Sequence, residues 1–181
     1  NGMRMKKNRS ETGILSDEDL DAIPGVPSKE FLAKGPIAII KCAEEIPCNP
    51  CVDACPKGAI RIEGNINALP VLLSEKCNGC GLCIPSCPGL AIFIVDMTYS
   101  EEEAIVKLPY EFLPLPQKGD TVIVMDREGK DIGKGKIHSV LSQRSFDRTP
   151  IVSIRVPKRI AIEVNHFRAT KGEKYNFINY G

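Results

Sequence analysis

The sequence contains no tryptophan and only two histidines, and aromatic residues make up 6% of its 181 residues. Aromatic side chains are the usual stacking platforms for single-stranded nucleic acid, so this composition argues against that ligand. The charge is nearly balanced, with 24 basic and 23 acidic residues, which leaves no general basic surface. No apolar run approaches the length of a membrane span, and no secretory leader is visible. We therefore expect a cytoplasmic protein with no membrane and no nucleic-acid partner.

Motifs for catalysis and nucleotide binding are also missing. There is no P-loop, and Gly133 and Gly135 lack the rest of a dinucleotide-binding fingerprint. His138 and His166 accompany no visible nucleophile or carboxylate motif, so we expect both to be structural or surface residues. The sequence therefore predicts no catalytic residue of its own.

Cysteine, in contrast, is abundant and confined to one segment. The chain has eight cysteines, and all of them lie between Cys42 and Cys87. The second run has the spacing C-x2-C-x2-C-x3-C-P, which is a spacing of bacterial iron–sulfur ligation. The first run is a C-x5-C-x2-C-x3-C-P variant. The two runs consist of Cys42, Cys48, Cys51 and Cys55, and of Cys77, Cys80, Cys83 and Cys87.

The two runs are also an internal repeat. When the first is shifted by 32 positions, three cysteines, the following proline and three aliphatic residues coincide with their counterparts, and only Cys42 breaks the offset. Soft thiolates in two such sets suit two [4Fe–4S] clusters. Two zinc sites would explain paired C-x2-C motifs but neither the third cysteine nor the C-P ends. A disulfide framework is typical of small secreted chains, so it fits less well.

Residues 35–96 resemble the bacterial-type ferredoxins with two [4Fe–4S] clusters. The resemblance implies an α+β fold in which a pseudo-twofold module repeats strand, cluster loop, short helix and strand. The expected strands are residues 36–40, 59–63, 71–73 and 91–96. The implied ligands of cluster I are Cys42, Cys48, Cys51 and Cys87, and those of cluster II are Cys77, Cys80, Cys83 and Cys55.

The first site departs from the family because Glu45 holds the usual position of the first ligand. Either a longer loop, residues 43–47, brings Cys42 to the cluster, or this site has three thiolates; we favour four. Cluster II is flanked by Gly79 and Gly81, whereas Pro47 and Pro50 remove donors near cluster I. Hydrogen bonds to sulfur raise a cluster's potential, so we predict the lower potential for cluster I.

The rest of the chain predicts three further segments. Residues 1–34 form an extension or docking arm, with a capped helix at residues 17–22. Residues 97–168 predict a small β-barrel-like domain, with strands at 121–125, 132–141 and 151–156 and a short helix after Pro157. Residues 169–181 form a tail.

A cluster with four thiolate ligands has no open position for substrate, so the expected function is one-electron transfer. The extra segments favour a permanent subunit of an oxidoreductase complex over a free ferredoxin carrier. Residues 46–51 also resemble the ferredoxin subunits of flavin-dependent amino-acid or amine dehydrogenases of anaerobes, which implies a flavoprotein partner. The alternatives are a cluster-bearing structural module or a redox-sensing regulator. The regulator would need a basic patch made of Arg144, Arg148, Arg155, Lys158 and Arg159.

Overall fold

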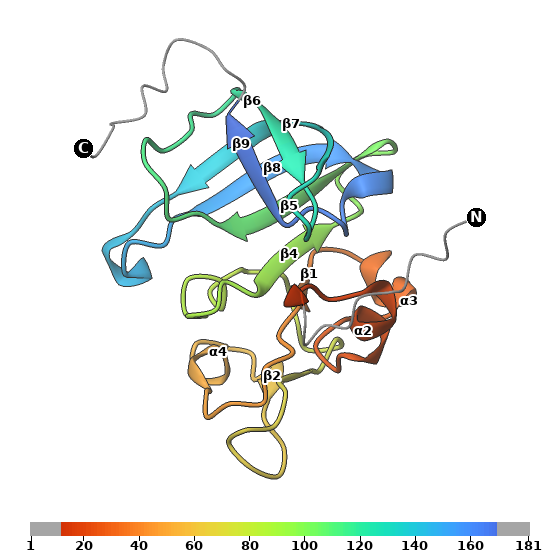
Figure 1. Cartoon of the computed structure of the whole chain (residues 1–181), viewed down its shortest axis with the longest axis vertical. Helices are drawn as coiled ribbons and strands as arrows, with labels where there is room; N and C mark the ends of the chain where they lie inside the picture. The colour runs from red at the N-terminus through yellow and green to blue at the C-terminus, as the bar shows by residue number, and fades with distance from the viewer. Residues whose placement is uncertain (1–11, 170–181) are drawn as a thin grey trace.

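The computed structural model describes residues 12–169 of the chain, which are mostly antiparallel strands with a few short helices (Figure 1). The helical elements are α2 (Asp17–Ala22), α3 (Lys29–Leu32), α4 (Pro50–Asp53) and the 3-10 turns η1 (Arg144–Phe146) and η2 (Lys158–Ile160). The strands are β1 (Ile37–Ile40), β2 (Ile60–Arg61), β3 (Val71–Leu72), β4 (Ile92–Asp96), β5 (Glu103–Pro109), β6 (Thr121–Met125), β7 (Asp131–Leu141), β8 (Ile151–Pro157) and β9 (His166–Ala169).

One seven-stranded sheet runs through most of the molecule in the order β1-β4-β5-β8-β7-β6-β9, and β2 and β3 form a separate pair. The sheet passes from the cysteine-bearing region into the C-terminal strands because β4 pairs with β5, with Ile94 opposite Lys107. The predicted boundary at residue 97 lies in the turn between these two strands. Figure 1 shows β1 and β4 between the lower loops and the upper strands.

A single hydrophobic core extends across this boundary. Alternate residues of β5 and β8, such as Val106 and Ile154, point inward and are fully buried, as expected for strands with one covered face. The same cluster of contacts includes Ile39 of β1 and Ile94 of β4. Burial of aliphatic side chains therefore holds the two regions together.

The C-terminal strands curl toward each other. Tyr110, just after β5, stacks on Phe167 of β9 with ring centroids 4.7 Å apart. The hydrogen-bonded sheet of the described residues nevertheless has open edges at β1 and β9. The ferredoxin-like and barrel-like fold assignments stay predictions. After Pro157 the expected helix is only the short turn η2.

The β2–β3 pair is shorter than predicted, and a proline explains where it ends. Its ladder stops at the pair of Arg61 and Val71. The next pair would place Ile62 opposite Pro70, which has no N–H to donate. The return strand predicted for residues 59–63 is therefore only two residues long.

The two cysteine loops differ in their helices. In the first, α4 begins at Pro50, a position where a missing N–H does no harm. In the second, the equivalent segment forms turns, although a helix was expected. Pro85 lies inside that segment, at the position of Asp53 in the first, and disfavours a helical conformation of the residue before it. The expectation of a helix in both halves is therefore wrong for the second half.

The described part of the N-terminal arm packs on the chain itself. The predicted helix is present as α2, where the side chains of Ser16 and Asp19 each accept a backbone N–H of the other residue. Ile40 donates its N–H to Gly25 at 2.9 Å, which fixes the arm against β1. Residues 1–11 of the arm and residues 170–181 of the predicted tail lie outside the described residues.

Candidate metal centre

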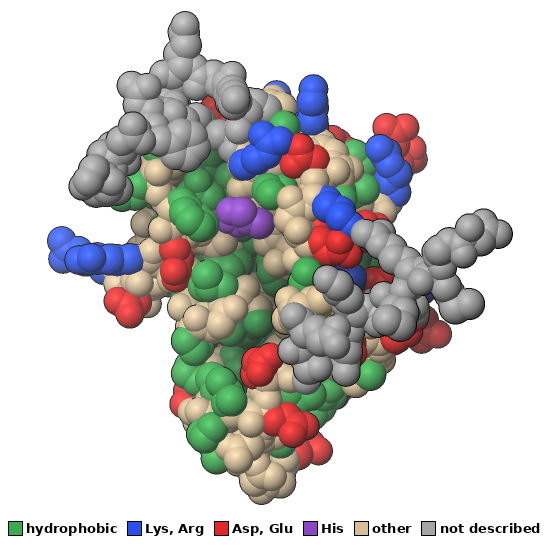
Figure 2. Space-filling model, viewed as in Figure 1, with side chains coloured by type: hydrophobic (Ala, Val, Ile, Leu, Met, Phe, Trp, Pro, Cys, Tyr) green, Lys and Arg blue, Asp and Glu red, His purple; other side chains and the backbone are tan. Residues whose placement is uncertain are grey.

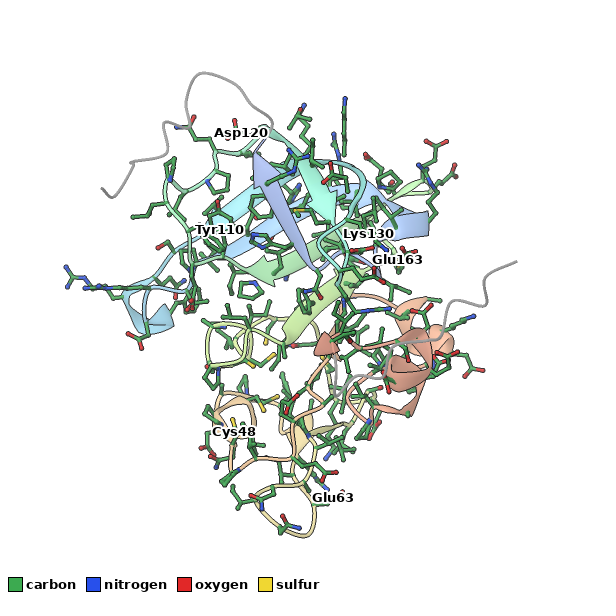
Figure 3. The ribbon with its side chains drawn as sticks, viewed as in Figure 1. Cys48, Glu63, Tyr110, Asp120, Lys130 and Glu163 are labelled. Atoms are coloured by element: carbon green, nitrogen blue, oxygen red, sulfur yellow. The ribbon has the colours of Figure 1, made fainter. Side chains whose placement is uncertain are left out.

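The eight cysteines line two cavities, with four in each. Cavity I has about 390 Å³ of open space and cavity II about 320 Å³. Cavity I is lined by Cys42, Cys48, Cys51 and Cys87, and cavity II by Cys55, Cys77, Cys80 and Cys83. Figure 3 labels Cys48 in the lower, loop-rich part of the molecule, well away from Tyr110 in the upper strands.

Each cavity combines three cysteines of one run with the last cysteine of the other. Cys55 ends the first run but lines cavity II, and Cys87 ends the second run but lines cavity I. This exchange follows from chain direction, since a turn after the third cysteine carries the fourth toward the opposite half. The sets are those implied by the ferredoxin resemblance; ligation itself stays a prediction.

The structure favours the longer-loop interpretation of the first site. Cys42 is half-buried and lines cavity I, whereas Glu45 is exposed and does not line it. Residues 43–47 form the loop that allows this arrangement. Glu44 also lines the cavity, so one carboxylate does stand near the four thiols. Four cysteines are therefore available at both cavities.

Backbone N–H groups donate to three of the sulfurs. Ala59 donates to Cys55 Sγ at 3.3 Å, and Ala91 donates to Cys87 Sγ at 3.4 Å. These two contacts occupy equivalent positions of the internal repeat. Ala38 of β1 donates to Cys77 Sγ at 3.4 Å. Such contacts orient thiolate ligands and tune the group that they hold.

The most buried thiol of each cavity has a raised pKa. Burial, followed by the neighbouring thiols of Cys87, Cys48 and Cys42, raises the pKa of Cys51 to about 11. Burial, followed by Cys77, Cys80 and Cys55, raises the pKa of Cys83 to about 12. The neighbours that act on each thiol are the other three members of its own cavity. Iron binding at either site must therefore displace thiol protons.

The donor set and its arrangement fit an iron–sulfur cluster. Thiolate is the ligand that Fe–S clusters take. Across residues 12–169, no three histidine, cysteine or acidic side chains form a group suited to a single metal ion. The four thiols of each set instead surround a cavity, as ligands of a bulky inorganic core do.

Close backbone approach at cavity II depends on glycine. Gly79 has φ +64°, and a Cβ there would lie 2.5 Å from Cβ of Pro36. The carbonyl of Gly79 accepts a hydrogen bond from Lys107 Nζ of β5 at 3.0 Å. The loop of the second run therefore packs against Pro36, just before β1, and is hydrogen-bonded to β5.

Lys41 is a feature that the sequence reasoning missed. Its side chain is 7% exposed, and Nζ donates to the carbonyls of Ile162 and Val164 and to Oδ1 of Asn165. Burial, with a smaller contribution from Arg127 and opposition from Glu163, lowers the pKa of Lys41 to about 7. Three acceptors match the three N–H donors of the ammonium form, so these contacts favour that form against the effect of burial. Lys41 thus links the strand before Cys42 to the C-terminal segment.

The remaining candidate residues fall outside the two cavities. His138 is exposed, with its ring 5.6 Å from that of Tyr99, and His166 packs among aromatic rings, as expected for structural residues. The five arginines and lysines of the regulator hypothesis are divided by β8. Arg144 and Arg148 precede this seven-residue strand, whereas Lys158 and Arg159 follow it, about 20 Å away. They do not form one patch.

Among the helices of residues 12–169, none has the length and apolar character needed to cross a membrane.

Comparison with known proteins agrees with the cysteine geometry. Residues 41–91 match the family model of the 4Fe-4S dicluster domain. The chain is 40% identical over 58 residues to the ferredoxin-type protein NapF of Haemophilus influenzae, covering 31% of this chain and 33% of that protein. It is 42% identical over 45 residues to the polyferredoxin-like subunit of an aliphatic sulfonate oxidoreductase of Pyrococcus furiosus, covering 25% of each chain.

A third relative is the polyferredoxin protein MvhB of Methanothermobacter marburgensis, 47% identical over 45 residues, which are 21% of this chain and 11% of that protein. The chain therefore spans a third or less of these relatives. No solved structure matches. The cysteine-bearing region is thus a ferredoxin-type 4Fe–4S domain that binds iron–sulfur, which supports a role in electron transfer.

Proposed function

We propose that this protein relays single electrons through two [4Fe–4S] clusters as a ferredoxin-like subunit of an oxidoreductase complex. Cluster I would be held by the cysteines of cavity I and cluster II by those of cavity II. A cluster held by four thiolates supplies one-electron chemistry without an open iron position for a substrate. The observation that carries the proposal is the division of the eight cysteines into two interlocked sets of four.

Metal analysis and paired variants test this assignment. Anaerobically prepared protein should contain about eight irons and equal sulfide, with rapid, reversible reduction by a low-potential donor. Cys87→Ser should alter the EPR signal of the same cluster as Cys48→Ser, although the two residues belong to different runs. Cys55→Ser should instead match Cys80→Ser. Zinc in place of iron would overturn the proposal. So would the finding that Cys87→Ser alters the same cluster as Cys80→Ser, a residue of its own run.

Cavity I is proposed to hold the cluster of lower potential. Cavity II has N–H donors to two of its sulfurs, from Ala38 and Ala59, and cavity I has one, from Ala91. Lys107 adds a positive charge beside the loop of cavity II. Both effects favour the reduced form of cluster II. An EPR-monitored redox titration of wild type and Cys42→Ser assigns the two potentials, and a higher value for cluster I would refute this order.

A permanent subunit is proposed over a free carrier, with a flavoprotein dehydrogenase as the partner. The 4Fe–4S domain is built into a larger sheet and shares its core with the strands that follow. The Pyrococcus furiosus relative is named as a subunit of an oxidoreductase. Residues 46–51 add the resemblance to ferredoxin subunits of amine and amino-acid dehydrogenases. Anaerobic purification from the native cell, with mass spectrometry of co-eluting chains, tests this; a consistently lone, fully loaded chain would refute it.

A further inference from the structure

Cavity II lies on the same face of the large sheet as a row of residues that reaches β8. Ala38 and Ile94 line the cavity and are opposite each other in β1 and β4. Ile94 is opposite Lys107 in β5, which in turn is opposite Ser153 in β8. Residues directly opposite in a sheet share one face. Arg155, two residues beyond Ser153, therefore shares this face, about 12 Å from Ile94 by strand geometry.

A basic face begins at Arg155. A cavity with about 750 Å³ of open space lies there. We use the name basic face for four residues that line it: Lys118, Lys136, His138 and Arg155. Lys136 is directly opposite Arg155 on the neighbouring strand. Like charges in that position destabilise a sheet, and the ion pair of Arg155 with Glu103 offsets only part of that cost. Glu103 lies 3.1 Å from Arg155 Nε, but without the geometry of a hydrogen bond.

Exposed apolar side chains lie on the same face of the sheet, one of them in contact with the basic face and one farther along β8. Tyr99 is 39% exposed and contacts the ring of His138. Leu82, which is 43% exposed, follows Gly81, and Gly81 approaches Ile151 of β8 on this same face. Cys80 is the only exposed cysteine of the described set. Protein interfaces combine exposed apolar side chains with charged ones.

We propose that the basic face and its apolar neighbours Leu82 and Tyr99 are the docking site for an electron-transfer protein with an acidic surface. The inference rests on the proposed function, because docking here would bring the partner beside cluster II. Charge complementarity selects an acidic partner. The exposed, spread positions of Lys118, Lys136 and His138 suit a broad surface better than one small anion, which needs convergent, buried donors.

A charge-reversal pair with a matched control tests the proposal. The test variant is Lys118→Glu/Lys136→Glu. The control is Lys29→Glu/Arg159→Glu, which makes the same charge change at exposed residues of α3 and η2. The probe is an acidic two-cluster ferredoxin, titrated into holoprotein by calorimetry at low and high ionic strength. Iron content and reversible reduction are measured on every preparation.

The expected result is that Lys118→Glu/Lys136→Glu weakens binding at least about tenfold at low salt, that the control changes it less than about twofold, and that high salt removes the difference. Equal weakening in both variants, or no binding by wild type, would overturn docking while leaving the relay intact. Absence of iron in wild type would instead overturn the proposed function. Inorganic phosphate is titrated at matched ionic strength; micromolar binding lost only in the test variant would identify a small-anion site and refute docking.

Discussion

The cysteine-bearing region, residues 35–96, and the C-terminal strands, residues 97–168, are built on different principles. The first region contains strands of two to five residues, whereas β7 in the second has eleven. The first carries four basic and six acidic residues, and the second twelve and ten. On the face in Figure 2, most Lys and Arg side chains lie over the upper strands, and acidic and hydrophobic side chains cover the lower part.

The difference lies in what fills the interior of each region. In the first region, two cavities lined by cysteine lie beside the buried aliphatic side chains of β1 and β4, so the folding of its loops depends on what those cysteines bind. Aliphatic side chains fill the second. The two are nevertheless joined through the β4–β5 pairing. The comparison therefore predicts that the regions depend on different stabilising interactions although they share one sheet.

The largest effect should come from removing iron. Anaerobic chelation should abolish the hydrogen-exchange protection of the cysteine loops, because empty cavities and buried, crowded thiols remain. Amides of β5 and β8 should stay protected. Hydrogen exchange with mass spectrometry compares the two forms. Simultaneous loss of protection at Val106 and Ile154 would show that the shared sheet makes both regions one cooperative unit.

The second-largest effect should come from truncating a core side chain in the C-terminal strands. Leu108→Ala removes a fully buried side chain of β5 and should lower the free energy of unfolding by about 2–5 kcal/mol. The matched control is Leu141→Ala, at a side chain 45% exposed, with an expected change of about 0.5 kcal/mol or less. Chemical denaturation gives both values. Iron content should be unchanged in Leu108→Ala, and loss of iron would weaken the distinction between the regions.

Lys41 tests the link between the regions. Lys41→Ala leaves three acceptors without their donor and should lower the free energy of unfolding by about 1–3 kcal/mol. In Lys41→Ala, amide hydrogen exchange should become faster at residues 162–165. Lys34→Ala is the control, since Lys34 is exposed and lies over the ring of Phe31. An unchanged free energy of unfolding for Lys41→Ala would mean that this link contributes no stability.

The smallest effect concerns His166 of β9. Burial lowers the pKa of His166 below its ordinary value, so on acidification the unfolded chain binds a proton before the folded one does. Stability should therefore fall as pH drops through about 6.5, the unfolded value. His166→Phe should flatten that dependence, and His138→Phe, at the exposed histidine, serves as the control. Urea unfolding at several pH values measures the pH dependence of the free energy of unfolding. The same dependence in His166→Phe as in wild type would show that His166 is not its source.

Local patterns predicted local features well. The capping box at Ser16 and Asp19 predicted α2, because both partners lie within one turn. The resemblance to two-cluster ferredoxins, which the cysteine spacing carries, implied the two sets of thiols that line the cavities. The expectation of two equivalent helices failed at Pro85, whose effect on the second loop outweighed the repeat.

Features that join distant parts of the chain were not predictable from sequence. Lys41 reads as an ordinary charged residue beside Cys42, and its acceptors lie more than 120 positions away. Lys136 and Arg155 meet only because β7 and β8 pair in one register, and Lys118 joins them beside Gly119, whose N–H donates to Ile137. Strand partners and register depend on packing over the whole sheet, so no short motif encodes them.

The residue order alone determined the chemistry of this protein, since thiolates at fixed short spacings select iron–sulfur ligation wherever the loops lie. The three-dimensional structure decided where that chemistry is placed. Pairing of β4 with β5 attaches the cysteine loops to the larger sheet and sets cavity II beside the basic face. The reason is that ligand spacing is a property of a few neighbouring residues, whereas the position of a site depends on long-range strand pairing and a shared core.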